Sequence, residues 1–274
     1  MDLTPRQREW TPDTTARFWA YRALRADHSR YFSNQVGAGL VNFARLAGVL
    51  RGQVLDYGCG PGYLIAQLLR HPVRVFGCDV SSEAVAVVNQ RFQAATNWCG
   101  AAVSGNGERT SESLGGRDFD LVYCVETLEH LTDQSLEHVL RDILQLTRPG
   151  GYIIVTTPCA EDLQKGYVYC PFCNSEFHHV QHLRSFTPQS MTETLTQAGL
   201  RVVFTRSLNF ANFQEFPSLG PLRTLSAQRA IKLLRYRRRW ILDRFLPRTI
   251  GRSRVLESCM SPGPHLCALA QRLE

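Results

Sequence analysis

Residues 126–130 read Glu-Thr-Leu-Glu-His and place two carboxylates and one imidazole within five positions. If a helical turn starts here, Glu126, Glu129 and His130 fall on one side of it, because positions i, i+3 and i+4 are neighbours on a helix. Two carboxylates and an imidazole can hold a divalent cation and leave coordination positions for the oxygens of a substrate. The alternative without a metal makes His130 a general base.

A second group of metal-ligating residue types lies in residues 169–186, which read YCPFCNSEFHHVQHLRSF. The spacing C-x2-C-x4-H-x3-H resembles that of a tetrahedral zinc site, in which two thiolates meet one ion at about 2.3 Å. The residues with this spacing are Cys170, Cys173, His178 and His182. His179 is a competing ligand. The alternative to zinc is a cysteine-bearing loop beside a histidine-rich substrate pocket.

A glycine cluster follows an apolar strand in residues 53–62, QVLDYGCGPG, and an apolar helix pattern comes next. Glycine permits a sharp turn and the close approach of a ligand, and the start of a helix adds free N–H groups and a positive dipole end. The next expected strand, Val73–Cys78, ends in Asp79, about twenty residues past the glycines, where an acid can accept both hydroxyls of a ribose. The alternative is an ordinary strand–turn–helix with glycines at the turn.

Strands and helices alternate along the rest of this region, and the alternation predicts a parallel sheet covered by helices on both faces. Besides the two strands already named, the expected strands are Cys99–Ser104, Phe119–Val125, Tyr152–Thr157, Leu200–Thr205 and an antiparallel His265–Leu273. The expected helices are two within residues 13–50, then Glu83–Phe92, Ser135–Thr147 and Pro188–Ala198.

The ordered strings VLDYGCGPG, GCD, FDLVYCVETLEHL and RPGGYIIVTTP resemble the motifs of class I methyltransferases that depend on S-adenosylmethionine, over roughly residues 50–200. This resemblance implies an α/β fold, a doubly wound seven-stranded, mostly parallel Rossmann-like sheet. It places Asp56 near the ammonium of the cofactor and Asp79 on its ribose. The cofactor-binding residues that it implies are Asp56, Gly58, Cys59, Gly60, Gly62, Asp79, Val80, Asn106 and Val125. A nicotinamide dehydrogenase is disfavoured, because an acid precedes the glycines and Pro-Gly follows them.

The adenine contact is less defined. The loop after the third strand reads SGNGERTSESLGG and departs from the common Gly-Asp pattern of the family. Asn106, Glu108 and Glu112 therefore remain open as the residue that contacts adenine.

The string E-x-x-E-H resembles one in ubiquinone-pathway O-methyltransferases and in small-RNA 3′-end methyltransferases, where it binds a metal that positions the hydroxyl to be methylated. In the small-RNA enzymes a downstream histidine completes the site, and His182 is its nearest equivalent here. The catalytic cation and the zinc ion would thus compete for His182, and zinc would then need His179 or Cys159. Insertions after the fifth strand build a substrate lid in this family, so we expect zinc to be structural and to shape the wall of the active site.

Length and composition limit the remaining possibilities. The chain has 274 residues, enough for one sizeable core and small additions. It contains no apolar run of about 18 residues that would span a membrane and no secretory h-region. The nine cysteines are expected to be reduced thiols. These features predict a cytoplasmic protein.

The expected parts of the chain are an N-terminal helical cap (1–50), a cofactor-binding core (51–206 and 263–274) with the Cys/His insertion (159–187), and a basic helical insertion (207–262). Residues 223–254 hold eleven basic residues and one acid, while the whole chain has a net charge of +7. This segment is interpreted as a solvated helix face, or as a cationic amphipathic helix at the surface of an anionic membrane. Binding of nucleic-acid phosphates is the least favoured interpretation.

The sequence therefore predicts methyl transfer to a small-molecule, lipid-linked or sugar-linked acceptor, at oxygen because of the E-x-x-E-H resemblance. Two alternatives remain. One is methylation of RNA, and the other is a non-catalytic module that retains the cofactor fold and binds nucleic acid.

Overall fold

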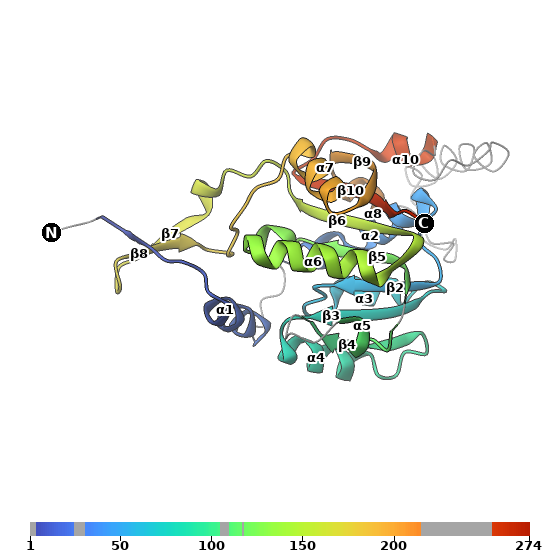
Figure 1. The fold of residues 1–274 in the computed structure, drawn as a ribbon, viewed down its shortest axis with the longest axis horizontal. Helices are drawn as coiled ribbons and strands as arrows, with labels where there is room; N and C mark the ends of the chain where they lie inside the picture. The colour runs from blue at the N-terminus through green and yellow to red at the C-terminus, as the bar shows by residue number, and fades with distance from the viewer. Residues whose placement is uncertain (1–3, 25–30, 105–109, 117, 215–253) are drawn as a thin grey trace, which may run out of the picture.

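A seven-stranded sheet forms the centre of the computed structural model, which describes residues 4–24, 31–104, 110–116, 118–214 and 254–274 (Figure 1). The strand order is β4-β3-β2-β5-β6-β10-β9, and all neighbours are parallel except β10, which runs antiparallel to β6 and β9. The predicted doubly wound, mostly parallel sheet with an antiparallel last strand is confirmed. The strands are β2 (Gln53–Tyr57), β3 (Arg74–Asp79), β4 (Trp98–Val103), β5 (Phe119–Val125), β6 (Thr147–Pro158), β9 (Leu200–Leu208) and β10 (His265–Arg272).

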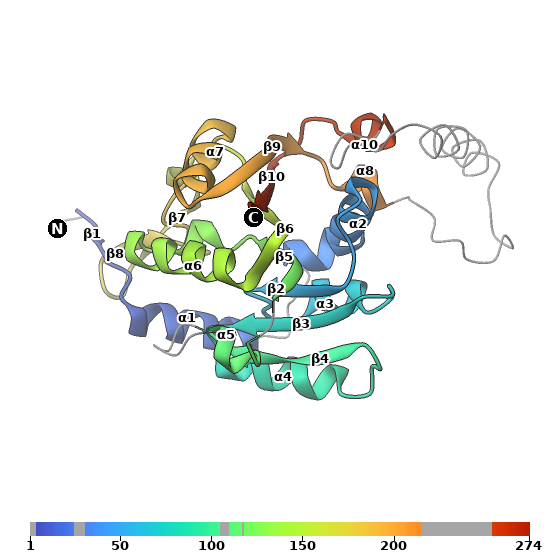
Figure 2. The same ribbon diagram turned by 45° about the vertical axis from the view of Figure 1, so that its right-hand side comes forward.

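Helices cover both faces of this sheet (Figures 1 and 2). Two N-terminal helices lie within residues 13–50 as predicted, apart from the first residue of α1, and the other helices begin and end close to their expected positions. The longer helices are α1 (Pro12–Leu24), α2 (Phe32–Ala47), α4 (Ser82–Phe92), α6 (Asp133–Leu146) and α7 (Pro188–Gln197). The short ones are α3 (Tyr63–Leu68), α5 (Thr110–Ser113), α8 (Ala211–Gln214) and α10 (Arg254–Cys259).

Alternating side chains of the central strands build two apolar layers. In β5, Leu121 and Tyr123 pack against α2, α3 and α4, while Val122 and Cys124 pack against α6 and α7. Strand segments buried on both faces are apolar, which explains the apolar runs 121–125 in β5 and 152–155 in β6. These two packed layers fix the carboxyl ends of the strands, and they thereby fix the positions of the polar residues that follow.

The strand β6 differs from its predicted range. It begins at Thr147, directly after α6, and runs through Arg148-Pro149-Gly150-Gly151, which was expected to be a loop. Gly150 takes a positive φ of 71°, and the register with β5 shifts between Phe119 and Leu121. This irregularity lets the strand start immediately at the end of the helix.

A second, small sheet was not predicted. The strands β7 (Tyr167–Cys170) and β8 (Ser175–His178) form an antiparallel hairpin within the expected Cys/His insertion. The N-terminal strand β1 (Arg6–Gln7) pairs in parallel with β8. Figure 1 shows this three-stranded sheet projecting from the end of the main sheet, with the amino terminus beside it.

Within the described residues no helix has the length and apolar character needed to cross a membrane. The basic segment, residues 223–254, lies outside the described residues except for Arg254, where α10 begins. Its expected role at a membrane surface thus stays a prediction.

Candidate active site at the carboxyl ends of the strands

The loop between β2 and α3 offers an open backbone surface at Gly60. A Cβ atom at Gly60 would meet only a ring carbon of Tyr31, at 3.9 Å, whereas at Gly62 it would lie 2.8 Å from a ring carbon of Phe92. Gly60 and Gly62 have φ values of 48° and 78°, which L side chains rarely adopt. Gly62 is therefore required for packing against α4, and Gly60 leaves a cradle into which a ligand can come close to the backbone.

Asp79 closes the same cradle from the end of β3. One carboxylate oxygen accepts the N–H of Gly60 at 2.8 Å, and the other accepts the N–H of Ser81 at 2.9 Å. Burial raises the pKa of Asp79, and the backbone donors oppose this shift. The adjacent side chain of Val80 is 50% exposed. A carboxylate beside an exposed apolar side chain fits the ribose and the base of a nucleoside.

Asp56 lies inside the sheet, directly before the loop. It is 2% exposed, and burial, followed by the negative charge of Asp79, raises its pKa to about 8. A positively charged ligand group in the cradle would offset the energetic cost of a negative charge on the buried Asp56 carboxylate. The buried carboxylate of Asp56 therefore suits the predicted contact with the ammonium group of the cofactor on electrostatic grounds.

The remaining predicted cofactor residues differ in their placement. Gly58 starts the loop with a φ of 79°, and Val125 ends β5 with 9% exposure. The side chain of Cys59 is buried in the core, so this residue shapes the loop only through its backbone. Asn106 falls outside the described residues.

A second cluster lies at the end of β5. Potential ligand atoms of Glu129, His130 and His182 all lie within 4.8 Å of one another. The turn that carries the first two is a single 3-10 turn, Leu128–His130. These three residues are brought together as the resemblance implied.

Glu126 does not join this group, so the expected helical side shared by Glu126, Glu129 and His130 is wrong. The turn starts only at Leu128, and Glu126 has a φ of 46°, outside the helical region. Its carboxylate instead faces His265, with Oε2 at 3.4 Å from Nδ1. A strained backbone of this kind is found mainly at functional sites. His265, at the start of β10, was not predicted as a site residue.

The carboxylate of Glu129 is buried without a partner. Its side chain is 1% exposed, and neither oxygen accepts a hydrogen bond. Burial, followed by the charge of Glu126, raises its pKa well above the ordinary value, and Glu161 adds to the shift. Leaving a carboxylate unpaired in the interior costs several kcal/mol. A divalent cation bound here would remove that cost, so the residues present fit a metal.

His130 is oriented for ligation by its neighbours. Its Nδ1 lies 3.2 Å from the carbonyl oxygen of Gln181 and donates to it, which leaves Nε2 free on the side of Glu129. Gln181 also accepts the indole N–H of Trp19, at 2.7 Å, and donates to the carbonyl of His130. Burial, followed by the charge of His182, lowers the pKa of His130 to about 3. The imidazole is therefore neutral near pH 7, as a metal ligand must be.

Glu161 orients His182 in a similar way. The Nδ1 atom of His182 donates to Glu161 Oε2 at 2.5 Å, which leaves its Nε2 free. The backbone N–H of His182 donates to Nδ1 of His178 at 3.1 Å, so His178 carries its proton on Nε2, 3.7 Å from the other oxygen of Glu161. The two imidazole rings are stacked with centroids 4.7 Å apart. Glu161, which sequence reasoning missed, thus faces a nitrogen atom of each imidazole, one with each carboxylate oxygen.

The four-residue zinc site predicted from the sequence is not formed. Cys170 and Cys173 lie at the tip of the hairpin, whereas His178 ends β8 opposite Tyr167. Three residues along a strand span about 10 Å, and no helix of the described chain contains both His178 and His182. The groups of three or more metal-ligating side chains in the described parts of the chain contain neither cysteine.

The alternative zinc ligands do not complete the site either. His179 lies 2.8 Å through Nδ1 from the carbonyl of Gly166, and it is absent from the metal-ligating groups within the described residues, as is Cys159.

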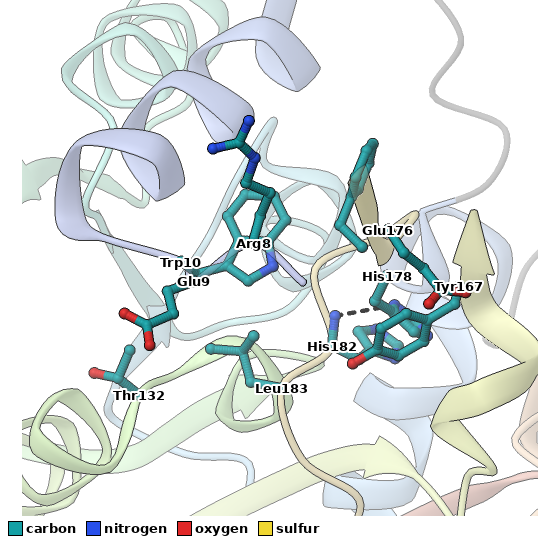
Figure 3. Close-up of a pocket in the computed structure, with 10 residues that line it drawn as sticks. Arg8, Glu9, Trp10, Thr132, Tyr167, Glu176, His178, His182 and Leu183 are labelled. Atoms are coloured by element: carbon teal, nitrogen blue, oxygen red, sulfur yellow. Dashed lines mark hydrogen bonds between the residues drawn. The ribbon is translucent and has the colours of Figure 1, made fainter. Parts of the chain in front are cut away.

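A cavity of about 350 Å³ opens beside the stacked histidines (Figure 3). Aromatic side chains of the N-terminal segment and of the hairpin form part of its wall, together with His178 and His182. It is lined by Arg8, Glu9, Trp10, Thr132, Tyr167, Glu176, Phe177, His178, His182 and Leu183. Of the second cluster, His182 lines this cavity, so an acceptor molecule bound here would lie against His182 and the neighbouring His178.

These features define a class of protein. A sheet with this strand order, a glycine loop at the end of β2 and an acid at the end of β3 match the family model described as "Methyltransferase domain" over residues 34–204, and the chain belongs to that family. It is a methyltransferase that depends on S-adenosylmethionine, whose methyl group it transfers.

The chain is also similar to particular methyltransferases. A ubiquinone biosynthesis O-methyltransferase from Cupriavidus pinatubonensis is 34% identical over 187 residues, which are 64% of this chain and 70% of that enzyme. Other enzymes of the same name are matched over less than half of their length.

Solved structures show the same fold. An S-adenosylmethionine-dependent methyltransferase from Clostridium acetobutylicum superposes with a TM-score of 0.56 at 10% identity, over 94% of this chain and 99% of that one. The 1,6-didemethyltoxoflavin-N1-methyltransferase from Burkholderia thailandensis, solved with S-adenosylhomocysteine, gives 0.53 at 17% identity, over 98% and 94%.

Proposed function

We propose that the chain methylates a hydroxyl oxygen of a small-molecule, lipid-linked or sugar-linked acceptor, with a divalent cation held by Glu129, His130 and His182. The buried, unpartnered carboxylate of Glu129 carries this proposal. The carboxylate lies beside an imidazole whose free nitrogen faces it. The cation would supply Lewis acidity that favours ionisation of a coordinated hydroxyl.

Two groups of residues then bind the methyl donor and the acceptor. The glycine loop and Asp79 hold the donor at the ends of β2 and β3, and the second cluster holds the acceptor at the ends of β5 and β6. Positioning supplies much of the rate in an in-line displacement. The pKa of His130, lowered to about 3, makes it a poor base near neutral pH, which favours its role as a ligand over that of a general base.

The acceptor is best described by the cavity and by the relatives. Trp10, Tyr167 and Phe177 line the cavity, and aromatic walls suit an acceptor with a flat apolar or aromatic part. The relatives named as O-methyltransferases support oxygen as the methylated atom. Family membership favours this enzyme over a non-catalytic binding module.

Mass spectrometry tests the proposal most broadly. A cell extract is incubated with the metal-replete enzyme and with S-adenosylmethionine deuterated in its methyl group. We expect a compound that gains one deuterated methyl group on oxygen, and expect a chelator to abolish the product. Labelling on nitrogen or carbon, or undiminished labelling with the chelator, would contradict the proposal.

Cofactor affinity is expected to rise with pH between about 7 and 9. Below its pKa of about 8, Asp56 is neutral and cannot pair with the cofactor ammonium; above it the carboxylate is charged and can. Each pKa unit corresponds to about 1.4 kcal/mol, so affinity should rise up to about tenfold per pH unit below the pKa. Isothermal titration with S-adenosylhomocysteine at several pH values measures this.

The Asp56→Asn variant is the control for this titration, because it removes the ionisable group. Its affinity should be lower at pH 9 and should change little between pH 7 and 9. An equally steep rise in the variant would assign the pH dependence to another group.

Glu161→Gln is expected to weaken metal binding by about 10–100-fold, the usual effect of losing a carboxylate that orients a ligating histidine. The amide can place its NH2 toward Nδ1 of His182 and so disturb the ring orientation that Glu161 now fixes. Titration with Mn2+ measures the affinity directly, without an assay of turnover.

Asp162→Asn provides a matched comparison in the same loop. Asp162 is exposed; it pairs with Lys165 at 3.5 Å and accepts the backbone N–H of Gln164 at 3.3 Å, and it pairs with no histidine of the described chain. This variant should bind Mn2+ as the unmodified protein does. Equal affinities for the two variants would exclude the positioning role of Glu161.

A further inference from the structure

The turn of the small hairpin presents two thiols at its tip. Cys170 ends β7, and Cys173 precedes Asn174, whose φ is 51°. Cys170 pairs with Ser175 in the hairpin register, so the turn 171–174 places Cys173 near Cys170, and the thiol of Cys170 helps to lower the pKa of Cys173. Two cysteines separated by two residues in a tight turn are the usual half of a structural zinc site.

The surroundings favour the thiolate form of this pair. The polar groups of Ser175, followed by the thiol of Cys170, lower the pKa of Cys173, and the charge of Arg8 acts in the same direction. The Ser175 hydroxyl donates to the carbonyl oxygen of Cys173, at 3.3 Å, and accepts a hydrogen bond from Arg8 Nε, at 2.8 Å, which holds Arg8 in place. A nearby cation makes a thiol a better metal ligand.

The described part of one chain supplies only half of such a site. Structural zinc takes four protein ligands in a tetrahedron. Among the described residues, neither Cys170 nor Cys173 belongs to a group of three or more metal-ligating side chains. The two histidines expected from the sequence are directed instead to Glu161.

We propose that Cys170 and Cys173 form one half of a four-thiolate zinc site, which a second copy of this chain completes with the same two residues. A two-fold axis through the ion would bring identical hairpin tips together, as in the isologous interfaces of most dimers. Figures 1 and 2 show the hairpin projecting from the main sheet, so its tip is accessible to another molecule.

The surface of the hairpin supports a second copy as the occupant. Within the described residues, seven large apolar side chains are exposed, and three of them lie on this hairpin: Val168 at 41%, Tyr169 at 47% and Phe172 at 98%. Phe172 sits between the two cysteines. Exposed apolar side chains gathered at one place mark an interaction site, and a copy held by the ion would cover them.

The zinc site would also stiffen the wall of the cavity. The strand β8 leads away from the tip, and its residues Glu176, Phe177 and His178 line the cavity. The proposal does not depend on the methylated acceptor or on the cation at Glu129, and its test uses neither.

The test compares the full-length protein with the Cys170→Ser/Cys173→Ser variant, both purified without added metal. Elemental analysis should find half an equivalent of zinc per chain more in the unmodified protein, which light scattering should show as a dimer and the variant as a monomer. Exchange of zinc for Co2+ should give thiolate-to-cobalt charge-transfer absorption in the unmodified protein alone, since carboxylate and imidazole ligands give none.

Two further variants keep the test decisive. Cys99→Ser removes a thiol elsewhere and should leave zinc content and mass unchanged. Phe172→Asp keeps both cysteines but should weaken the dimer, so that higher protein concentration is needed to form it. A monomer with thiolate-bound cobalt, a dimer unaffected by the double serine variant, or a Cys170–Cys173 disulfide with no zinc in freshly reduced protein would each overturn the proposal.

Discussion

Glu129→Gln is expected to lower kcat by at least about 100-fold, because the acceptor hydroxyl loses the ion that positions it. Glu129 supplies the carboxylate of the second cluster, and its partners in that group of potential ligands are His130 and His182. An amide cannot supply the negative charge. The affinity for S-adenosylhomocysteine should stay nearly unchanged, since the glycine loop and Asp79 are separate from this cluster.

The matched control is Glu137→Gln on the exposed side of α6, which should keep full turnover. Three measurements are needed: turnover, Mn2+ binding and cofactor affinity. The metal role fails if Glu129→Gln binds Mn2+ as tightly as the unmodified protein. It also fails if a chelator leaves turnover of the unmodified protein unaltered.

Asp79→Asn is expected to weaken cofactor binding by about 10–100-fold. The carboxylate now accepts N–H groups from Gly60 and from Ser81. The amide NH2 cannot accept, so one of these donors would face another donor and the loop would shift. Hydrogen bonds to a charged group contribute about 1.5–3 kcal/mol, which corresponds to this range. Isothermal titration with S-adenosylhomocysteine measures the loss.

Glu83→Gln tests whether this effect belongs to the ribose site. Glu83 accepts the hydroxyl of Ser81 at 2.9 Å, close to Asp79 in the chain, but it is exposed. Its replacement should leave cofactor affinity within about twofold, as expected of surface substitutions. Equal losses in the two variants would point to a general disturbance of the loop.

The cofactor half of the site could be predicted because it depends on local signals. The sequence shows one strand that is followed by glycines and another that ends in an acid. In a parallel sheet, these two local patterns are enough to place Gly60 and Asp79 at the same edge. The sheet order brings these edges together, and the structure shows Asp79 bonded to the N–H of Gly60.

The cluster that we propose to bind a metal was predicted only in part. Glu129 and His130 are adjacent in sequence, and His182 was found by resemblance. The side chain of Glu126 was misplaced, because its positive φ cannot be seen in a helical spacing rule. Glu161 enters the site only through tertiary contacts, so no pattern marks it.

The hairpin could not be predicted for a different reason. Its strand β8 is paired in parallel with residues 6 and 7, far away in the chain, and no local periodicity reveals such a contact. The C-x2-C-x4-H-x3-H spacing was therefore interpreted as a single tetrahedral zinc site. On a strand, the same spacing separates Cys173 from His178.

A crystal structure grown with Mn2+ and S-adenosylhomocysteine, with anomalous diffraction data, tests the central claim most directly. We expect an anomalous peak bound by Glu129, His130 and His182, and the ribose hydroxyls on Asp79. A nucleoside bound with no manganese at these three side chains, or manganese bound only at other residues, would contradict the account.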